Sequence, residues 1–186
     1  ARRQAHQRRG MAFRCVLRGN SAYGLHPLRY SVPRERRRRY DVVNMHAAFA
    51  ELSSGLQQLL IGKTAHHDGE IDLRNYGIRL RDGQTYPKAS HPLIPVHPKN
   101  GKPYLFANGS FTSHIEGISR WESDMLLQGL YQRAATNPRI QCRIKWTPNT
   151  VVMWDNRSVQ HRAILDYAGF ARYGERVSVL DREGPR

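Results

Sequence analysis

The chain has 186 residues and 39% hydrophobic residues, which is enough for one globular domain with a hydrophobic core. No apolar run approaches the roughly 20 residues of a membrane-crossing helix, and no apolar stretch follows the basic first residues. We therefore expect neither a membrane span nor a signal peptide, and we expect a cytoplasmic location. The formal net charge of +15 is high enough to suit a nucleic-acid-binding protein.

Most of the positive charge lies at one end of the chain. Residues 1–40 contain twelve arginines, no lysine and a single acid, Glu35, whereas residues 41–186 are close to balanced. A phosphate-binding surface normally combines lysine with arginine, so this bias points to another origin and makes nucleic acid an unexpected partner. The alternative is a non-catalytic binding protein whose basic N-terminal arm contacts nucleic acid or other polyanions.

Two short helices are expected between residues 44 and 60. Apolar residues recur there at near-helical spacing, and the Ser-Ser-Gly sequence at 53–55 interrupts them. Either serine can cap the second helix, and Gly62 can end it.

The segment from His66 to His97 is polar and contains glycine and proline, which predicts mainly loop. Strand signals near Ile71 and Ile78 are weak. A short strand is expected at 104–107, after the Asn-Gly turn at 100–101.

A longer helix is predicted to begin after Ser119. Ser119 and Glu122 form a capping-box pattern, and apolar residues follow at helical spacing. The expected apolar stripe consists of Trp121, Met125, Leu126 and Leu130.

The last third of the chain is predicted to be β. Turn residues at 148–149 and 155–156 separate apolar or alternating runs. The expected strands are 140–146, 150–154, 159–165 and 176–180. Short strands with helices outside them favour a mainly β fold with flanking helices, such as a jelly roll.

One histidine, His161, lies in the strand expected after the second turn. Because side chains alternate along a strand, His161 shares a face with the small apolar residues at 159 and 163 and should point into the barrel. On this feature alone it could be a core histidine bonded to backbone. Arg172 and Arg176 share a face of the last strand, and two guanidinium groups facing a lumen would be costly without an anion there. Solvated loop arginines are the alternative.

These residues and their spacing resemble the taurine dioxygenase (TauD/TfdA) family of Fe(II)- and 2-oxoglutarate-dependent oxygenases. The resemblance covers Asn44 to Arg186, and the last motif below is specific. Besides Arg172 and Arg176, it is carried by NMHAAFAELSSGLQQLLIGKTAHHDG (44–69), HPLIPVHPKNGKPYLFANGSFTSHIEGIS (91–119) and WDNRSVQHRAILDY (154–167). It implies a double-stranded β-helix, incomplete at the N-terminus, with residues 44–186 as the C-terminal part of the domain and 1–43 as a separate basic segment.

The resemblance also implies residue roles. His161 resembles the distal histidine of the iron site, Arg172 the partner of the far carboxylate of 2-oxoglutarate, and Arg176 a residue that holds the acidic head of the substrate. A 2-His-1-carboxylate triad leaves positions open for the keto acid and dioxygen, and a planar guanidinium matches a carboxylate. The implied reaction hydroxylates a small acidic organic substrate, a sulfonate or carboxylate, with release of succinate and CO2. The open sheet edges of an incomplete barrel would favour a homo-oligomer.

The other two iron ligands of the family come from an upstream His-x-Asp, usually within WH(S/T)D, and that motif does not precede His161. The His-Ile-Glu sequence at 114–116 matches a family stretch that does not bind the metal. The His-His-Asp sequence at 66–68 follows a helix end and is predicted to be solvated surface. One histidine cannot fix Fe(II) tightly, so the chain as written is expected to be inactive. A non-catalytic protein that still binds a dicarboxylate through Arg172 is a further alternative.

A shifted reading frame would account for the missing motif. Moved forward by one nucleotide, the codons of residues 11–17 can be read as W-H-S-D-V-S-F, those of 21–28 as P-P-M-G-S-I-L-Y and those of 36–40 as V-G-G-D-T. These are family motifs in family order. The same displacement turns GC-rich codons for Gly, Ala, Asp and Val into arginine codons. We therefore predict that residues 1 to about 42 are an out-of-frame translation that packs poorly.

Overall fold

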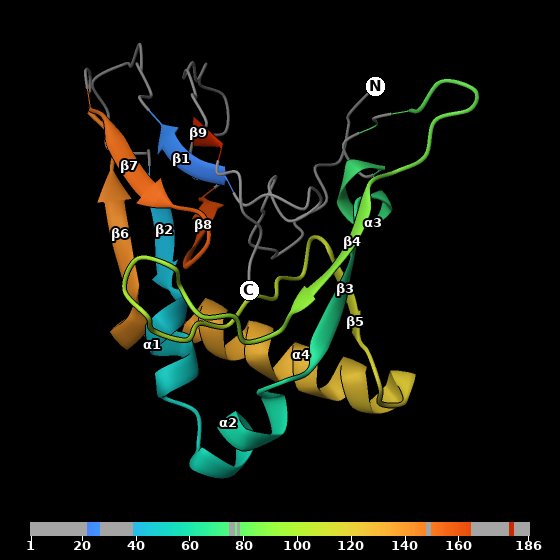
Figure 1. Cartoon of the computed structure of the whole chain (residues 1–186). Coiled ribbons are helices and arrows are strands. Elements are labelled where there is room, and N and C mark those ends of the chain that lie inside the picture. Colours follow the sequence, from blue (N-terminus) through green and yellow to red (C-terminus); the bar gives the residue numbers. More distant parts are fainter. Residues whose placement is uncertain are drawn as a thin grey trace.

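The computed structural model describes residues 22–26, 39–74, 77, 79–147, 150–164 and 179–180, with only the backbone described for 22–26, 39, 163 and 179–180. These residues form three three-stranded sheets, four α-helices and one 3-10 helix (Figure 1). The strands are β1 (Ala22–His26), β2 (Arg39–Asn44), β3 (Thr64–Asp68), β4 (Lys88–Pro92), β5 (Thr112–Ile115), β6 (Gln141–Lys145), β7 (Val152–Asp155), β8 (Val159–Ala163) and β9 (Val179–Leu180). The helices are α1 (Met45–Ala50), α2 (Ser54–Leu60), α3 (Glu70–Leu73), α4 (Arg120–Thr136) and the 3-10 helix η1 (Pro138–Ile140).

Two sheets contain the C-terminal strands, with orders β7-β1-β9 and β6-β2-β8, and all of their pairs are antiparallel. The strands expected in the last third of the chain are confirmed for β6, β7 and β8. β9 covers the described end of the fourth. The backbone of residues 22–26 forms β1 although this segment is expected to pack poorly; its side chains are outside the description.

The third sheet, in the order β4-β3-β5, corrects the prediction of a loop from His66 to His97. Residue Ile71, expected near a strand, lies in the short helix α3, and Ile78 lies outside the described residues. The alternation of β3 was hidden because its two buried side chains are Ala65 and His67, so no large apolar residue marks the inner face. Burial and the neighbouring His91 and His66 lower the pKa of His67 to about 3, which keeps its ring neutral inside the protein.

The strand expected at 104–107 is also wrong. These four residues are all buried, but their backbone N–H groups do not bond to a single partner strand. Tyr104 N donates to Pro95 O, Leu105 N to Met45 O and Phe106 N to Leu93 O. The apolar run is therefore an extended buried segment that ties the loop from 93 to 108 to α1.

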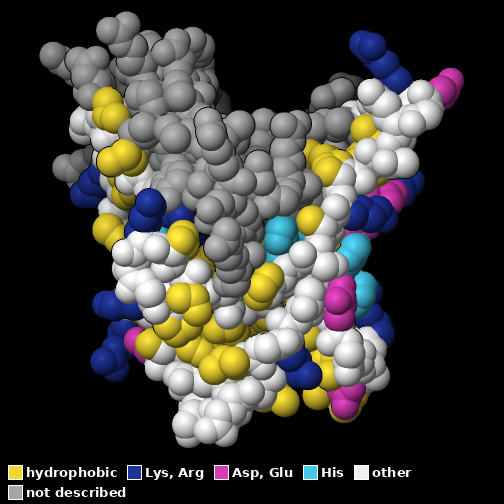
Figure 2. Space-filling view, in the orientation of Figure 1, with side chains coloured by type: hydrophobic (Ala, Val, Ile, Leu, Met, Phe, Trp, Pro, Cys, Tyr) yellow, Lys and Arg dark blue, Asp and Glu magenta, His cyan; other side chains and the backbone are white. Residues whose placement is uncertain are grey.

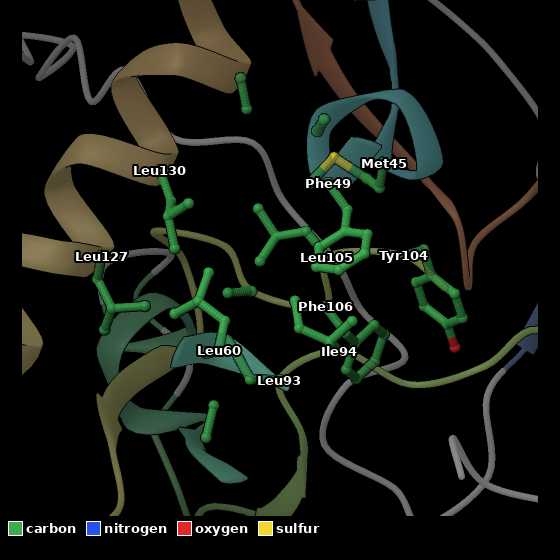
Figure 3. Close-up of a cluster of buried hydrophobic side chains, with 14 of the residues drawn as sticks. Met45, Phe49, Leu60, Leu93, Ile94, Tyr104, Leu105, Phe106, Leu127 and Leu130 are labelled. Carbon is green, nitrogen blue, oxygen red and sulfur yellow. The ribbon is translucent and has the colours of Figure 1, made fainter. Parts of the chain in front are cut away.

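The main hydrophobic core lies between α1, α2, α4 and the β4-β3-β5 sheet, around this buried segment (Figures 1 and 3). Leu60 and Leu93 are fully buried, and complete burial of a leucine side chain stabilises a fold by about 1.5–3 kcal/mol. The break between α1 and α2 is confirmed. Ser53 caps α2 by accepting from Leu56 N, and Gly62 follows the helix with a φ of 80°.

Helix α4 begins as predicted. Ser119 Oγ accepts from Glu122 N, and Glu122 Oε2 accepts from Ser119 N at 2.8 Å. The expected apolar stripe is only partly correct, since Trp121 and Met125 are 68% and 54% exposed while Leu127 and Leu130 are buried. No helix in the described part of the chain is long and apolar enough to cross a membrane.

Candidate functional site

His161 lies on β8, between two sheets. Its partner across the strand pair is Val42 of β2, and its ring is stacked against Tyr40 of the same strand with centroids 6.0 Å apart. The ring also contacts Trp154 of β7, in the other sheet, with centroids 4.8 Å apart. The half-buried imidazole thus meets an aromatic ring from each of the two sheets.

The alternation predicted along β8 holds, but the opposite face is the more buried one. Ser158 and Gln160 are buried, and the Gln160 side-chain amide donates to Ala107 O in the main core. Ser158 O accepts from Met45 N at 2.9 Å. Strand β8 is therefore held to the core by one face and presents His161 on the other.

The turn before β8 is organised around Asp155. Its carboxylate accepts from the backbone N and the guanidinium of Arg157, and its Oδ2 accepts from His97 Nε2 at 2.9 Å. Burial would raise the pKa of Asp155, but the hydrogen bonds from Arg157 and His97 outweigh it and hold the pKa below its ordinary value. Arg157 is only 2% exposed, so this carboxylate is the counter-charge that a buried guanidinium requires.

The turn also fixes the indole that faces His161. Trp154 Nε1 donates to Asn156 Oδ1 at 2.7 Å, and Ser158 N donates to Asp155 O. Sequence patterns assigned these residues to a turn and gave no sign of these contacts. The available signal in the sequence was an arginine two residues after an aspartate within the predicted turn.

Arg172 and Arg176 lie outside the described residues. Their proximity to His161, and their expected roles with 2-oxoglutarate and substrate, stay predictions.

The residues described do not complete an iron site. Among them, no group of three or more His, Cys, Asp or Glu side chains is arranged to hold a metal ion. Two aspartates on strands next to β8 already bind arginines. Asp155 of β7 binds Arg157, and Asp41 of β2 binds Arg143 and Arg162. His161 alone does not fit Fe(II), which a facial triad holds through three side chains.

The two other histidine-acid sequences lie in the β4-β3-β5 sheet, 66–68 on β3 and 114–116 at the end of β5. His66, His114 and Glu116 lie on the more exposed face of this sheet, whereas His67 lies on the buried face. Histidine and acidic side chains gather at this flank of the molecule (Figure 2). Their members contact one another: the rings of His66 and His114 are 5.3 Å apart, and Ser90 Oγ lies 3.1 Å from His66 Nδ1 and donates to Glu116 at 2.6 Å. Asp68 forms a 2.7 Å ion pair with Lys88. The prediction of solvated surface is therefore wrong for His67, which is fully buried, and His66 and Asp68 are only half-buried.

Comparison with known proteins gives a consistent result. Residues 41–178 match the family described as "Taurine catabolism dioxygenase TauD, TfdA family". An alpha-ketoglutarate-dependent sulfonate dioxygenase of Saccharomyces cerevisiae is 38% identical over 124 residues, 64% of this chain and 29% of that protein. An alpha-ketoglutarate-dependent 2,4-dichlorophenoxyacetate dioxygenase of Cupriavidus pinatubonensis is 34% identical over 144 residues, 76% of this chain and 50% of that protein.

The crystal structure of a taurine dioxygenase from Burkholderia xenovorans superposes with a TM-score of 0.70 at 26% identity, covering 87% of this chain and 53% of that one. The chain thus spans half or less of the curated relatives described above. A family match over residues 41–178, with strands and helices that superpose on a solved member, leads to one conclusion: the chain belongs to the TauD/TfdA family.

Proposed function

We propose that the chain is the C-terminal part of a double-stranded β-helix dioxygenase, incomplete at its N-terminus. Such an enzyme would use Fe(II), 2-oxoglutarate and dioxygen to hydroxylate a small acidic substrate, with release of succinate and CO2. The observation that carries the proposal is the 154–161 segment, which holds the imidazole of His161 between two sheets by means of a buried ion pair.

The substrate class follows from the relatives and from the two arginines. The S. cerevisiae relative is named for sulfonates and the C. pinatubonensis relative for an aryloxyacetate, so both act on small anions. In this proposal His161 is an iron ligand, Arg172 binds the far carboxylate of 2-oxoglutarate, and Arg176 binds the substrate anion. A guanidinium is suited to both anions because its N–H groups can bind two oxygens at once.

We further propose that the chain as written does not turn over. It lacks the WH(S/T)D sequence, and the described residues offer no replacement for the missing ligands. A cytoplasmic location and self-association through open sheet edges belong to the same proposal. Nucleic acid is not a proposed partner, because most of the surplus charge lies in residues 1–40.

Anaerobic titration with Fe(II) and 2-oxoglutarate tests this proposal. The chain as written is expected to give no visible metal-to-ligand charge-transfer band and no succinate after oxygen is admitted. A version in which residues 1–42 are translated in the frame that restores the W-H-S-D sequence is expected to give both.

The matched control for that test is His161→Ala in the restored protein, which should lose the band and the succinate together. A clear charge-transfer band from the chain as written would show that its iron site is intact and would contradict the proposal that this chain is inactive. Absence of succinate from the restored protein with sulfonates, sulfate esters and aryloxyacetates would overturn the dioxygenase assignment.

A further inference from the structure

His97 links the loop from 93 to 108 to the turn that precedes β8. It is buried, lies 64 residues before His161 in the chain, and its Nε2 contacts Asp155 Oδ2 at 2.9 Å. The imidazole of His97 thus meets the carboxylate of the turn directly. Its ring therefore connects two segments that are distant in sequence at the point where β8 begins.

The hydrogen bonds of His97 fix which ring nitrogen carries the proton. Lys99 N–H donates to His97 Nδ1 at 3.2 Å, so Nδ1 is an acceptor and the hydrogen is on Nε2. The Nε2–H group consequently donates to the carboxylate of Asp155. This geometry directs the Nε2–H of His97 at Asp155, and it requires the loop backbone at residue 99 to be in place.

The loop backbone around His97 is itself braced. His97 N donates to Lys102 O, Gly101 N donates to His97 O, and residues 96 and 103 form an isolated β-bridge. A second histidine, His46 of α1, holds the same loop through Pro103 O at 2.8 Å and Asn100 at 3.3 Å. The histidine that donates to Asp155 therefore lies on a turn that is held both by its own backbone hydrogen bonds and by His46.

Asp155 transmits this anchoring to the start of β8. Its two oxygens are shared between Arg157 and His97, and the Arg157 guanidinium is buried, so the carboxylate has little freedom to rotate. Without the His97 donor, Asp155 Oδ2 would keep its hydrogen bonds from Arg157, which lies two residues further along the same turn. The turn would then lose its hydrogen bond to the loop through His97, whereas Gln160 of β8 would still donate to Ala107 O.

We propose that His97 is a positioning residue: by donating to Asp155 it fixes the 155–158 turn and hence the direction in which β8 presents the His161 imidazole. It acts through Asp155 and touches no reacting group. The inference rests on the proposed function, because the direction of that imidazole matters only if His161 meets a ligand. Its structural consequence is nevertheless measurable without any ligand.

The test follows the His161 ring by nitrogen–proton correlation spectra of the full chain labelled with 15N-histidine. His161→Gln assigns the signal. His97→Leu removes the donor and is expected to shift or split the His161 ring signals by more than a line width. His97→Gln places an amide N–H donor close to the Nε2 position and is expected to keep the parent signals.

Two controls separate positioning from a general loss of stability. Ser123→Ala removes the buried side-chain oxygen that accepts from Ile115 N, at the contact of α4 with β5 in a different sheet from that of His161, and is expected to lower the melting temperature without moving the His161 signals. If His97→Leu does not fold, His97→Asn replaces it, because its shorter amide cannot reach Asp155.

Unchanged His161 signals in the variant that lacks the donor, with a fall in melting temperature like that of Ser123→Ala, would overturn the proposal and leave His97 a structural residue only. Failure of the restored protein to produce succinate would remove the dioxygenase function and leave this spectroscopic result unaffected. The two failures are therefore distinguishable.

Discussion

Asp41 joins three strands through one carboxylate. It lies on β2 at 2% exposure and accepts from Arg143 Nε of β6 at 2.8 Å and from Arg162 Nη2 of β8 at 2.9 Å. Burial alone would raise the pKa of Asp41, but the hydrogen bonds from the two arginines lower it below the ordinary 3.8. The carboxylate is therefore charged in the folded protein and cross-links the sheet that carries His161.

We predict that Asp41→Asn lowers the free energy of unfolding by about 1–3 kcal/mol, because two guanidinium groups lose their charged acceptor. The figure stays below that of a fully buried pair because the Arg143 side chain is 52% exposed. Urea denaturation measures the change. Asp124→Asn, which breaks the exposed pair with Arg120 on α4, should cost no more than about 0.5 kcal/mol.

The same substitution should change the pH dependence. An aspartate whose native pKa is depressed contributes stability that is complete above its unfolded pKa and is lost as the pH falls through the native value. The parent chain should therefore lose stability below about pH 4 more steeply than Asp41→Asn. Equal acid slopes, or equal losses for Asp41→Asn and Asp124→Asn, would contradict the cross-linking role.

Whole elements were predictable where local signals agree with tertiary packing. The capping box of α4, the break between α1 and α2, and the turn at Asp155 each depend on residues within a few positions of one another. Strands β3 and β4 were not predictable, because the buried positions that should mark their inner face are occupied by His67 and His91. Because histidine counts as a polar residue in a hydrophobicity pattern, the alternation of buried and exposed positions cannot be recognised in the sequence of these strands.

Helix α4 shows the opposite error, since its sequence contains more apolar residues than its buried face can use. Trp121 and Met125 satisfy helical spacing but face solvent, whereas Leu127 and Leu130 contact the core (Figure 3). Spacing alone cannot choose between the two stripes, because both repeat at intervals of three or four. The buried face of α4 is the one that packs against the β4-β3-β5 sheet, where Ser123 Oγ accepts from Ile115 N at 2.8 Å.

We predict that Leu127→Ala lowers the free energy of unfolding by about 2–5 kcal/mol, because it leaves a cavity between α4 and the core. Met125→Ala, two residues away on the same helix, should change it by less than about 0.5 kcal/mol. Thermal or urea unfolding of both variants gives the comparison. Equal losses would mean that Met125 is covered and that the exposed stripe has been assigned to the wrong side.

At the scale of the whole molecule, the sequence motif around His161 was enough to predict the family, but not the contacts that surround the His161 ring. The spacing around His161 identified the family, and the family match over residues 41–178 confirms it. The contacts that orient His161 involve Tyr40, Trp154 and the His97–Asp155 pair, which come from three separate parts of the chain. No local pattern reports such contacts, because they depend on how sheets face each other.

The family match begins at Asp41, next to the point at which the frame hypothesis places the return to the correct frame. The basic residues before it contain no lysine, which is the composition expected of displaced GC-rich codons. We therefore predict that a one-base repair of the encoding DNA near codons 41–43 restores W-H-S-D, P-P-M-G-S-I-L-Y and V-G-G-D-T in register. Sequencing that DNA measures this directly, and the remaining third frame, which should restore none of the three, is the control. A DNA sequence in which no single-base change restores them would make the arginine-rich segment a genuine part of the protein, and the basic-arm alternative would then account for its charge.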